Sequence, residues 1–180
     1  MMRVGSWLVV LVVVALLACG PLPRHVSPAW RPDLFVILVA YAALRVPPGQ
    51  DADALALCWM TGLAKDLLSA GPAGQYALLY LAAGAVIGRM RPALDARSAA
   101  SGAALAWAAA FTTECVAAWA AGREGGRLWP SAGAFRGVLS ASLVTACVAW
   151  PFFRCLDRLL RRKGKPRSLS ASYDEVGGEA

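Results

Sequence analysis

Residues 99–121 read AASGAALAWAAAFTTECVAAWAA, and this stretch decides the fold class. A helix that crosses a membrane needs about 20 predominantly apolar residues. The stretch meets that length and contains one ionisable side chain, Glu114. It therefore predicts a transmembrane helix with a carboxyl group about two thirds of the way along.

The composition of the whole chain agrees with a lipid environment. Of 180 residues, 58% are hydrophobic and 16% are charged, and the mean hydropathy is +0.54. Soluble domains are nearer half apolar and a quarter charged, and a domain of this size could not bury so much apolar surface. These values exclude a disordered chain, a collagen-like repeat and most soluble enzymes.

Five further apolar runs, bounded by Gly and Pro, accompany residues 99–121. None alternates with period two, so the pattern favours helices over barrel strands. We predict an all-α, polytopic bundle of about six transmembrane helices over residues 1–156, followed by a basic and then disordered cytoplasmic tail over 157–180. The six runs are 7–19, 34–46, 54–68, 75–88, 99–121 and 138–153.

The run 34–46 is too short to span a bilayer core of about 30 Å, since a helix rises about 1.5 Å per residue. Either flanking residues such as Trp30 extend the helix, or neighbouring helices and local thinning compensate. One or two of the runs could be buried helices that do not cross fully.

The formal net charge of +7 indicates how the chain is oriented in the membrane more than which partners it binds. With six crossings and a cytoplasmic N-terminus, twelve of the 18 Lys and Arg residues lie inside and six outside. Positive residues favour the cytoplasmic side, so both termini are expected there. A nucleic-acid partner is not expected, because basic residues beside apolar spans ordinarily meet lipid headgroups.

Two segments have alternative interpretations. The sequence LLACG at residues 16–20 follows Arg3 and a short apolar stretch, as in a lipoprotein signal that would leave Cys19 lipidated. We favour an ordinary first transmembrane helix, because five apolar runs follow. The basic tail could be a docking segment for a cytoplasmic partner, or only a topology anchor.

The charged residues inside the runs are more plausibly structural than catalytic. Glu114 is the main candidate for a functional intramembrane group, and the alternative is a carboxyl that bonds to a neighbouring helix. Lys65 and Asp66 are adjacent, point about 100° apart and do not simply pair with each other. Asp66 could accept from amides of the following turn, and Asp33 resembles an acidic residue at a helix start.

The sequence predicts no enzyme, no cofactor and no metal site. It has no GxSxG, HExxH, Walker A or GxGxxG motif, and His25 is the single histidine. Gly84 and Gly88 form a GxxxG pair that permits close helix packing. Trp7, Trp30, Trp119, Trp129 and Trp150 are expected as interface anchors, and the deeper Trp59 and Trp107 as packing residues.

Two segments carry a family resemblance. Arg31, Pro32 and Asp33 open an apolar helix that ends at YAALR, residues 41–45. Residues 61–74 then read TGLAKDLLSAGPAG, in which the distinctive positions are Gly62, Asp66, Ser69, Pro72 and Gly74. This pattern resembles the MreD family of rod shape-determining proteins. The chain departs from it by carrying Lys65 where an apolar or small residue is usual, Ala70 where Gly is common, and an Ala-rich fifth run.

The resemblance implies a non-enzymatic scaffold of the side-wall peptidoglycan machinery, in the bacterial cytoplasmic membrane. The implied partners are an MreC-like membrane protein and, indirectly, the MreB filament and a RodA-type glycosyltransferase with its transpeptidase. The implied fold is similar to the substrate-binding subunits of energy-coupling-factor transporters.

Two other classes remain open from the sequence. A vitamin-type transporter subunit would need an outward-facing polar pocket with Trp59, Trp107 and Glu114. An intramembrane enzyme would use Glu114 or Asp66.

Overall fold

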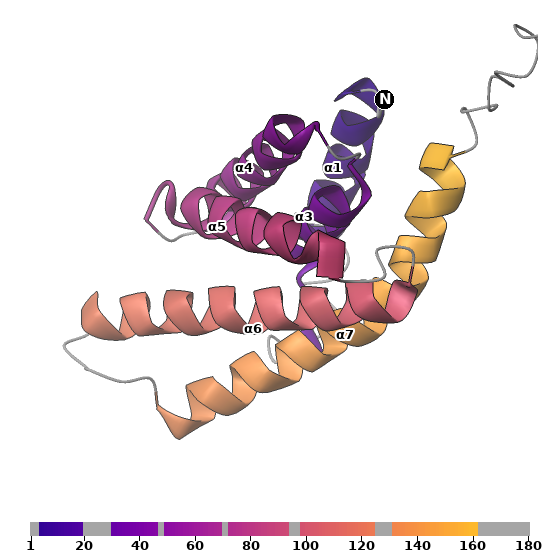
Figure 1. Ribbon diagram of the computed structural model, residues 1–180. Coiled ribbons are helices and arrows are strands. Elements are labelled where there is room, and N and C mark those ends of the chain that lie inside the picture. Colours follow the sequence, from indigo (N-terminus) through magenta and orange to yellow (C-terminus); the bar gives the residue numbers. More distant parts are fainter. Residues whose placement is uncertain are drawn as a thin grey trace, which may run out of the picture.

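The computed structural model describes residues 4–19, 30–46, 49–69, 72–93, 98–124 and 131–161. Over these residues the regular structure is entirely helical, which agrees with the predicted all-α class (Figure 1). The elements are α1 (Val4–Cys19), α3 (Leu34–Arg45), α4 (Asp51–Leu68), α5 (Gln75–Met90), the short 3-10 helix η2 (Arg91–Ala93), α6 (Ala99–Glu124) and α7 (Ala132–Arg161).

Helix α3 is the centre of the molecule. Every residue from Leu34 to Leu44 is buried, and α3 packs against α1, α4, α5, α6 and α7. A helix that is apolar on all sides belongs in an interior. Its 12 residues rise only about 18 Å. Trp30 does not extend it, because the helix starts at Leu34. The neighbouring helices therefore compensate for its shortness, since they cover it on every side.

Four of the other helices form two antiparallel hairpins, α4–α5 and α6–α7, which Figure 1 shows as separate layers. Both hairpins pack closely because glycine faces the partner helix. A Cβ on Gly62 of α4 would lie 2.4 Å from Cα of Ala77 in α5. A Cβ on Gly102 of α6 would lie 2.8 Å from Cε1 of Phe153 in α7. These two contacts set how closely each pair of helices approaches.

Helix α7 extends well beyond the predicted run 138–153. It begins at Ala132 and continues through Pro151 to Arg161. A proline inside a helix removes one backbone hydrogen bond and bends the axis, and Figure 1 shows α7 changing direction before its C-terminal end. The predicted tail thus starts within α7, and residues 162–180 lie outside the described part of the chain.

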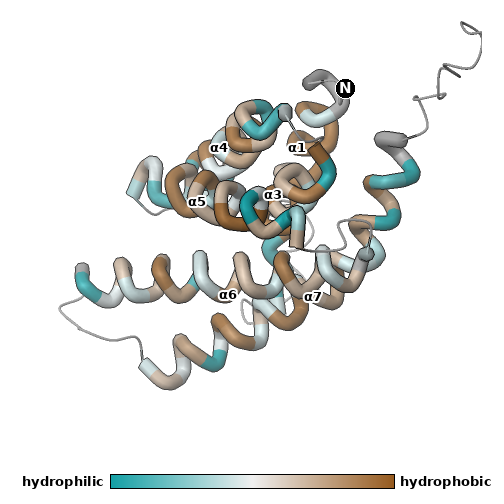
Figure 2. Tube along the Cα trace, viewed as in Figure 1, coloured by the Kyte–Doolittle hydropathy of each residue, from teal (hydrophilic) through white to brown (hydrophobic). Residues whose placement is uncertain are grey.

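Many large apolar side chains of the described helices are exposed, and Figure 2 shows hydrophobic residues, in brown, along these helices. Examples are Val9 and Leu16 of α1 and Leu78 of α5, each more than 60% exposed. Exposed apolar side chains in such number are typical of surfaces that contact lipid or another protein. By length and composition, two described helices could cross a bilayer, over Ala100–Arg123 and Ala132–Arg158. Six full crossings therefore remain a prediction.

The tryptophans do not follow their predicted roles uniformly. Trp7, expected as an interface anchor, is 1% exposed and stacks on Tyr41 of α3. Trp59 and Trp107, expected as packing residues, are 46% and 36% exposed. Those expectations were wrong because depth along an apolar run does not tell which face of the helix a residue occupies. Trp30, Trp119 and Trp150 are exposed, and their role as interface anchors stays a prediction; Trp129 lies outside the described residues.

The close contact at Gly62 gives a testable consequence. Gly62→Ala places a methyl group against the backbone of α5, and overpacking of this kind costs about 1–3 kcal/mol. The thermal unfolding midpoint of the detergent-purified protein should fall. Gly137→Ala in α7 is the matched control, because its Cβ would meet no atom within 4 Å. An equal midpoint for both variants would contradict this packing.

Candidate functional site

Asp33 forms the start of α3 and is the first element of a buried polar cluster. Its Oδ1 accepts from the backbone N–H groups of Phe35 (3.1 Å) and Val36 (3.3 Å). These two amides have no partner within the helix, and an aspartate at the N-cap satisfies them. The backbone N–H of Asp33 donates to Oγ1 of Thr145 in α7, at 2.8 Å. Asp33 therefore fixes where α3 begins and links it to α7.

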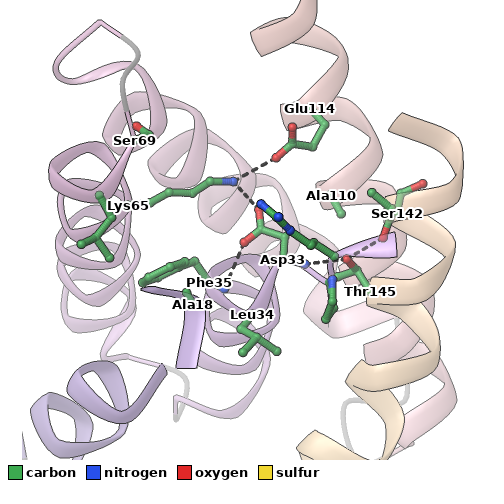
Figure 3. A pocket seen from close by; sticks show the side chains of 14 residues that line it. Ala18, Asp33, Leu34, Phe35, Lys65, Ser69, Ala110, Glu114, Ser142 and Thr145 are labelled. Carbon is green, nitrogen blue, oxygen red and sulfur yellow. Dashed lines mark hydrogen bonds and ion pairs between the residues drawn. The ribbon is translucent and has the colours of Figure 1, made fainter. Parts of the chain in front are cut away.

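Lys65 of α4 lies between two carboxylates. Its Nζ is 2.5 Å from Oδ2 of Asp33 and 2.9 Å from Oε1 of Glu114 in α6. The side chains of Lys65 and Asp33 are 14% and 11% exposed, and that of Glu114 is 30% exposed. One cation thus bridges the start of α3 to the later part of α6 (Figure 3).

Helix α5 contributes two tyrosines to the same cluster. The buried Tyr80 donates its hydroxyl hydrogen to Oδ2 of Asp33 at 2.8 Å. The ring of Tyr76 has Nζ of Lys65 over its face, 4.0 Å from the ring centre, where the quadrupole of the ring attracts a cation. The cluster of Asp33, Lys65, Tyr76, Tyr80, Glu114 and Thr145 therefore draws on all five helices from α3 to α7. We call it the Lys65 cluster.

A pocket of about 290 Å³ opens beside the Lys65 cluster. Arg31, Pro32 and Ser69 of the predicted family motifs line it, together with Asp33 and Glu114 (Figure 3). Trp59 and Trp107, which the transporter alternative required, are not among its lining residues. Four of the motif residues and Glu114 are thus brought together at this pocket, although they lie up to 83 positions apart in the sequence.

Asp66 has a different task from Lys65. Its carboxylate accepts from the backbone N–H groups of Tyr76 (2.9 Å) and Ala77 (3.0 Å), in the first turn of α5. The donating amides thus lie just beyond the turn that the sequence suggested. Asp66 satisfies free amides of α5 from the neighbouring helix, and its negative charge lies at the positive end of the α5 dipole.

The rest of the second motif shapes the connection between α4 and α5. The hydroxyl of Ser69 donates to the carbonyl oxygen of Asp66 at 3.3 Å. The carbonyl oxygen of Pro72 accepts from the N–H of Gln75 at 3.3 Å. Gly74, at the N-cap of α5, has a φ of +89°, a left-handed conformation that glycine adopts without strain. The motif therefore builds a helical hairpin.

A second polar cluster lies at the opposite end of α3, and sequence reasoning missed it. Asp157 of α7 pairs with Arg45 at 2.9 Å and accepts from the hydroxyl of Tyr41 at 3.1 Å. Arg91 donates to the carbonyl oxygen of Val46 and to Oδ1 of Asp51, both at 2.6 Å. The available signal was Asp157 itself, an isolated acid in a basic stretch of the sequence.

The GxxxG pair divides into two roles. A Cβ on Gly84 would lie 2.6 Å from Sγ of Cys58, so Gly84 permits close packing of α5 on α4. A Cβ on Gly88 would meet only Nη2 of Arg91, at 3.8 Å. Gly84 therefore is a helix-packing position, whereas Gly88 faces open space beside Arg91.

The contacts of the Lys65 cluster join helices to one another. Asp33 is engaged by two amides, a hydroxyl and Lys65, and Glu114 by Lys65. Within the described segments, no group of three or more His, Cys, Asp or Glu side chains is placed to hold a metal ion.

The two helices long and apolar enough to cross a membrane and the many exposed apolar side chains indicate the class: a helical membrane protein. The family follows from comparison with known families. The chain belongs to the MreD family, since the family model for rod shape-determining protein MreD matches residues 1–122, which include Asp33, Lys65, Asp66 and Glu114. Neither curated proteins nor solved structures give a match. Membership implies a role in determining rod shape.

Removing the central cation tests the Lys65 cluster. Lys65→Met leaves two partly buried carboxylates without their shared partner, and breaking a buried ion pair costs about 3–5 kcal/mol. The thermal midpoint and the amount of protein in the membrane should both fall. Arg123→Met is the control, because Arg123 is exposed near the end of α6 and lies over Trp119. Equal behaviour of the two variants would show that the cluster is not stabilising.

Asp66 gives a separate prediction. Asp66→Ala removes the acceptor for two amides at the start of α5 and should destabilise the protein by about 1–2 kcal/mol. Asp66→Asn keeps an acceptor oxygen and should lose less. Thermal unfolding of both variants in detergent measures the difference, and a larger loss for asparagine than for alanine would refute the capping role.

Proposed function

We propose that the chain is a non-enzymatic scaffold of the cell-elongation machinery, which positions side-wall peptidoglycan synthesis together with an MreC-like membrane protein. The MreB filament and a RodA-type glycosyltransferase with its transpeptidase are the indirect partners. The observation that carries this proposal is the family match over residues 1–122. The scaffold role and the partners are inferred from membership of that family.

The arrangement of polar groups supports a scaffold. The charges of the Lys65 cluster and of the Arg45–Asp157 pair are directed between helices, while the outer faces carry exposed apolar side chains. A protein that binds partners laterally in a membrane needs helix faces of fixed shape. Internal ion pairs join α3, α4, α6 and α7, the hydroxyl of Tyr80 adds α5, and together they supply that fixed shape.

We further propose a multi-pass topology in the bacterial cytoplasmic membrane with both termini in the cytoplasm. The Lys65 cluster and the Arg45–Asp157 pair lie at opposite ends of α3. In this topology they face opposite sides of the membrane. The excess of Lys and Arg in the segments near the Arg45 end favours that end as cytoplasmic. The Lys65 cluster and its pocket then face the outer side.

The decisive experiment for this function is recovery of the partner. The tagged chain, extracted in detergent from cells of its own species, should co-purify with an MreC-like protein, and its depletion should turn rods into round cells. Lys65→Met should lower partner recovery along with protein abundance, and Arg123→Met should lower neither. A folded, abundant chain that recovers no MreC-like protein would contradict the proposal.

A further inference from the structure

A second pocket, of about 350 Å³, lies between the end of α3, the start of α4 and the end of α5. Its volume is within the range of small-molecule sites. It is at the end of α3 opposite to the Lys65 cluster, so it is a separate site. Its lining residues are Ala43, Asp51, Ala54, Leu55, Gly84, Ala85, Gly88, Arg89, Arg91 and Pro92.

The walls of this pocket are small and apolar along α5 and α4. Gly84, Ala85 and Gly88 give one wall and Ala54 and Leu55 another. A Cβ on Gly88 would meet only Nη2 of Arg91, at 3.8 Å, so there is free space beside Gly88. An apolar groove of this shape suits a hydrocarbon chain more than a soluble polar molecule.

Two arginines are among the lining residues of the pocket. Arg91 uses Nη1 for the carbonyl oxygen of Val46 and Nη2 for Asp51, and its buried Nε has no acceptor among the described residues. Arg89 is exposed and also lines the pocket. Asp51 is neutralised by Arg91, so Arg89 leaves a net positive charge. A phosphate accepts hydrogen bonds from guanidinium groups in this setting.

We propose that this pocket binds an anionic phospholipid, with its headgroup phosphate at Arg89 and Arg91 and one acyl chain along Gly84 and Gly88. The pocket combines two arginines with an apolar groove, which matches both parts of such a lipid. It lies at the bundle end that the proposed topology assigns to the cytoplasmic leaflet, where anionic lipids attract basic residues. The inference concerns lipid binding and does not depend on an MreC-like partner.

Native mass spectrometry of the full-length, delipidated protein in detergent tests the site with three probes: phosphatidylglycerol, phosphatidylcholine and inorganic phosphate. The wild type should retain one phosphatidylglycerol and release phosphatidylcholine at lower collision energy. Arg89→Gln should weaken phosphatidylglycerol binding about tenfold, the effect of losing one charge-assisted hydrogen bond. Gly88→Leu should fill the groove and weaken binding similarly.

Matched controls separate the site from general effects. Arg123→Gln removes an exposed arginine elsewhere, and Gly137→Leu adds the same side chain where a Cβ meets no atom within 4 Å; both should bind like the wild type. If Gly88→Leu lowers the thermal unfolding midpoint, its weaker lipid binding can come from unfolding, and the lipid binding of Arg89→Gln alone then tests the proposal. Equal retention of the two lipids, competition by inorganic phosphate alone, or unchanged binding by Arg89→Gln would each overturn the proposal.

Discussion

The structure depends on the position of one cation, Lys65, between Asp33 and Glu114. Each partner comes from a different part of the chain, and each carboxylate alone would be costly to bury in an apolar bundle. With Lys65 between them, the cost of burial is offset by two charge-assisted hydrogen bonds. Asp33 also starts α3, so the ion pairs and the position of the central helix are set by the same side chain.

This constraint explains how a helix as short as α3 can occupy the centre of a membrane protein. Its residues from Leu34 to Leu44 are covered by other helices, so its length need not match the bilayer. Its two ends are held by different ion pairs, to Lys65 at the start and to Asp157 at the end. A shape-determining protein needs a rigid outline for lateral partners, and fixing the central helix at both ends provides it.

The sequence predicted the helical class, the family and the approximate position of each helix, because apolar runs bounded by Gly and Pro are local signals. It also placed Asp33 at a helix start and separated Lys65 from Asp66. It did not predict that Lys65 meets Glu114, since the pairing joins residues 49 positions apart and depends on how α4 and α6 pack. For the same reason the sequence did not predict the Arg45–Asp157 pair. It also gave Trp7 the wrong role, because the stacking of Trp7 on Tyr41 of α3 depends on tertiary packing.

Lys65 has a clear structural role, because its Nζ holds the two carboxylates of the cluster together. An apolar residue at that position would remove the cation that bridges Asp33 and Glu114. The most direct measurement is a double-mutant cycle between Lys65→Met and Glu114→Gln, with the free energy of unfolding measured in mixed micelles. We predict a coupling energy of about 1–3 kcal/mol, as for residues in one ion-pair network. A coupling energy near zero would contradict the central role of this ion pair.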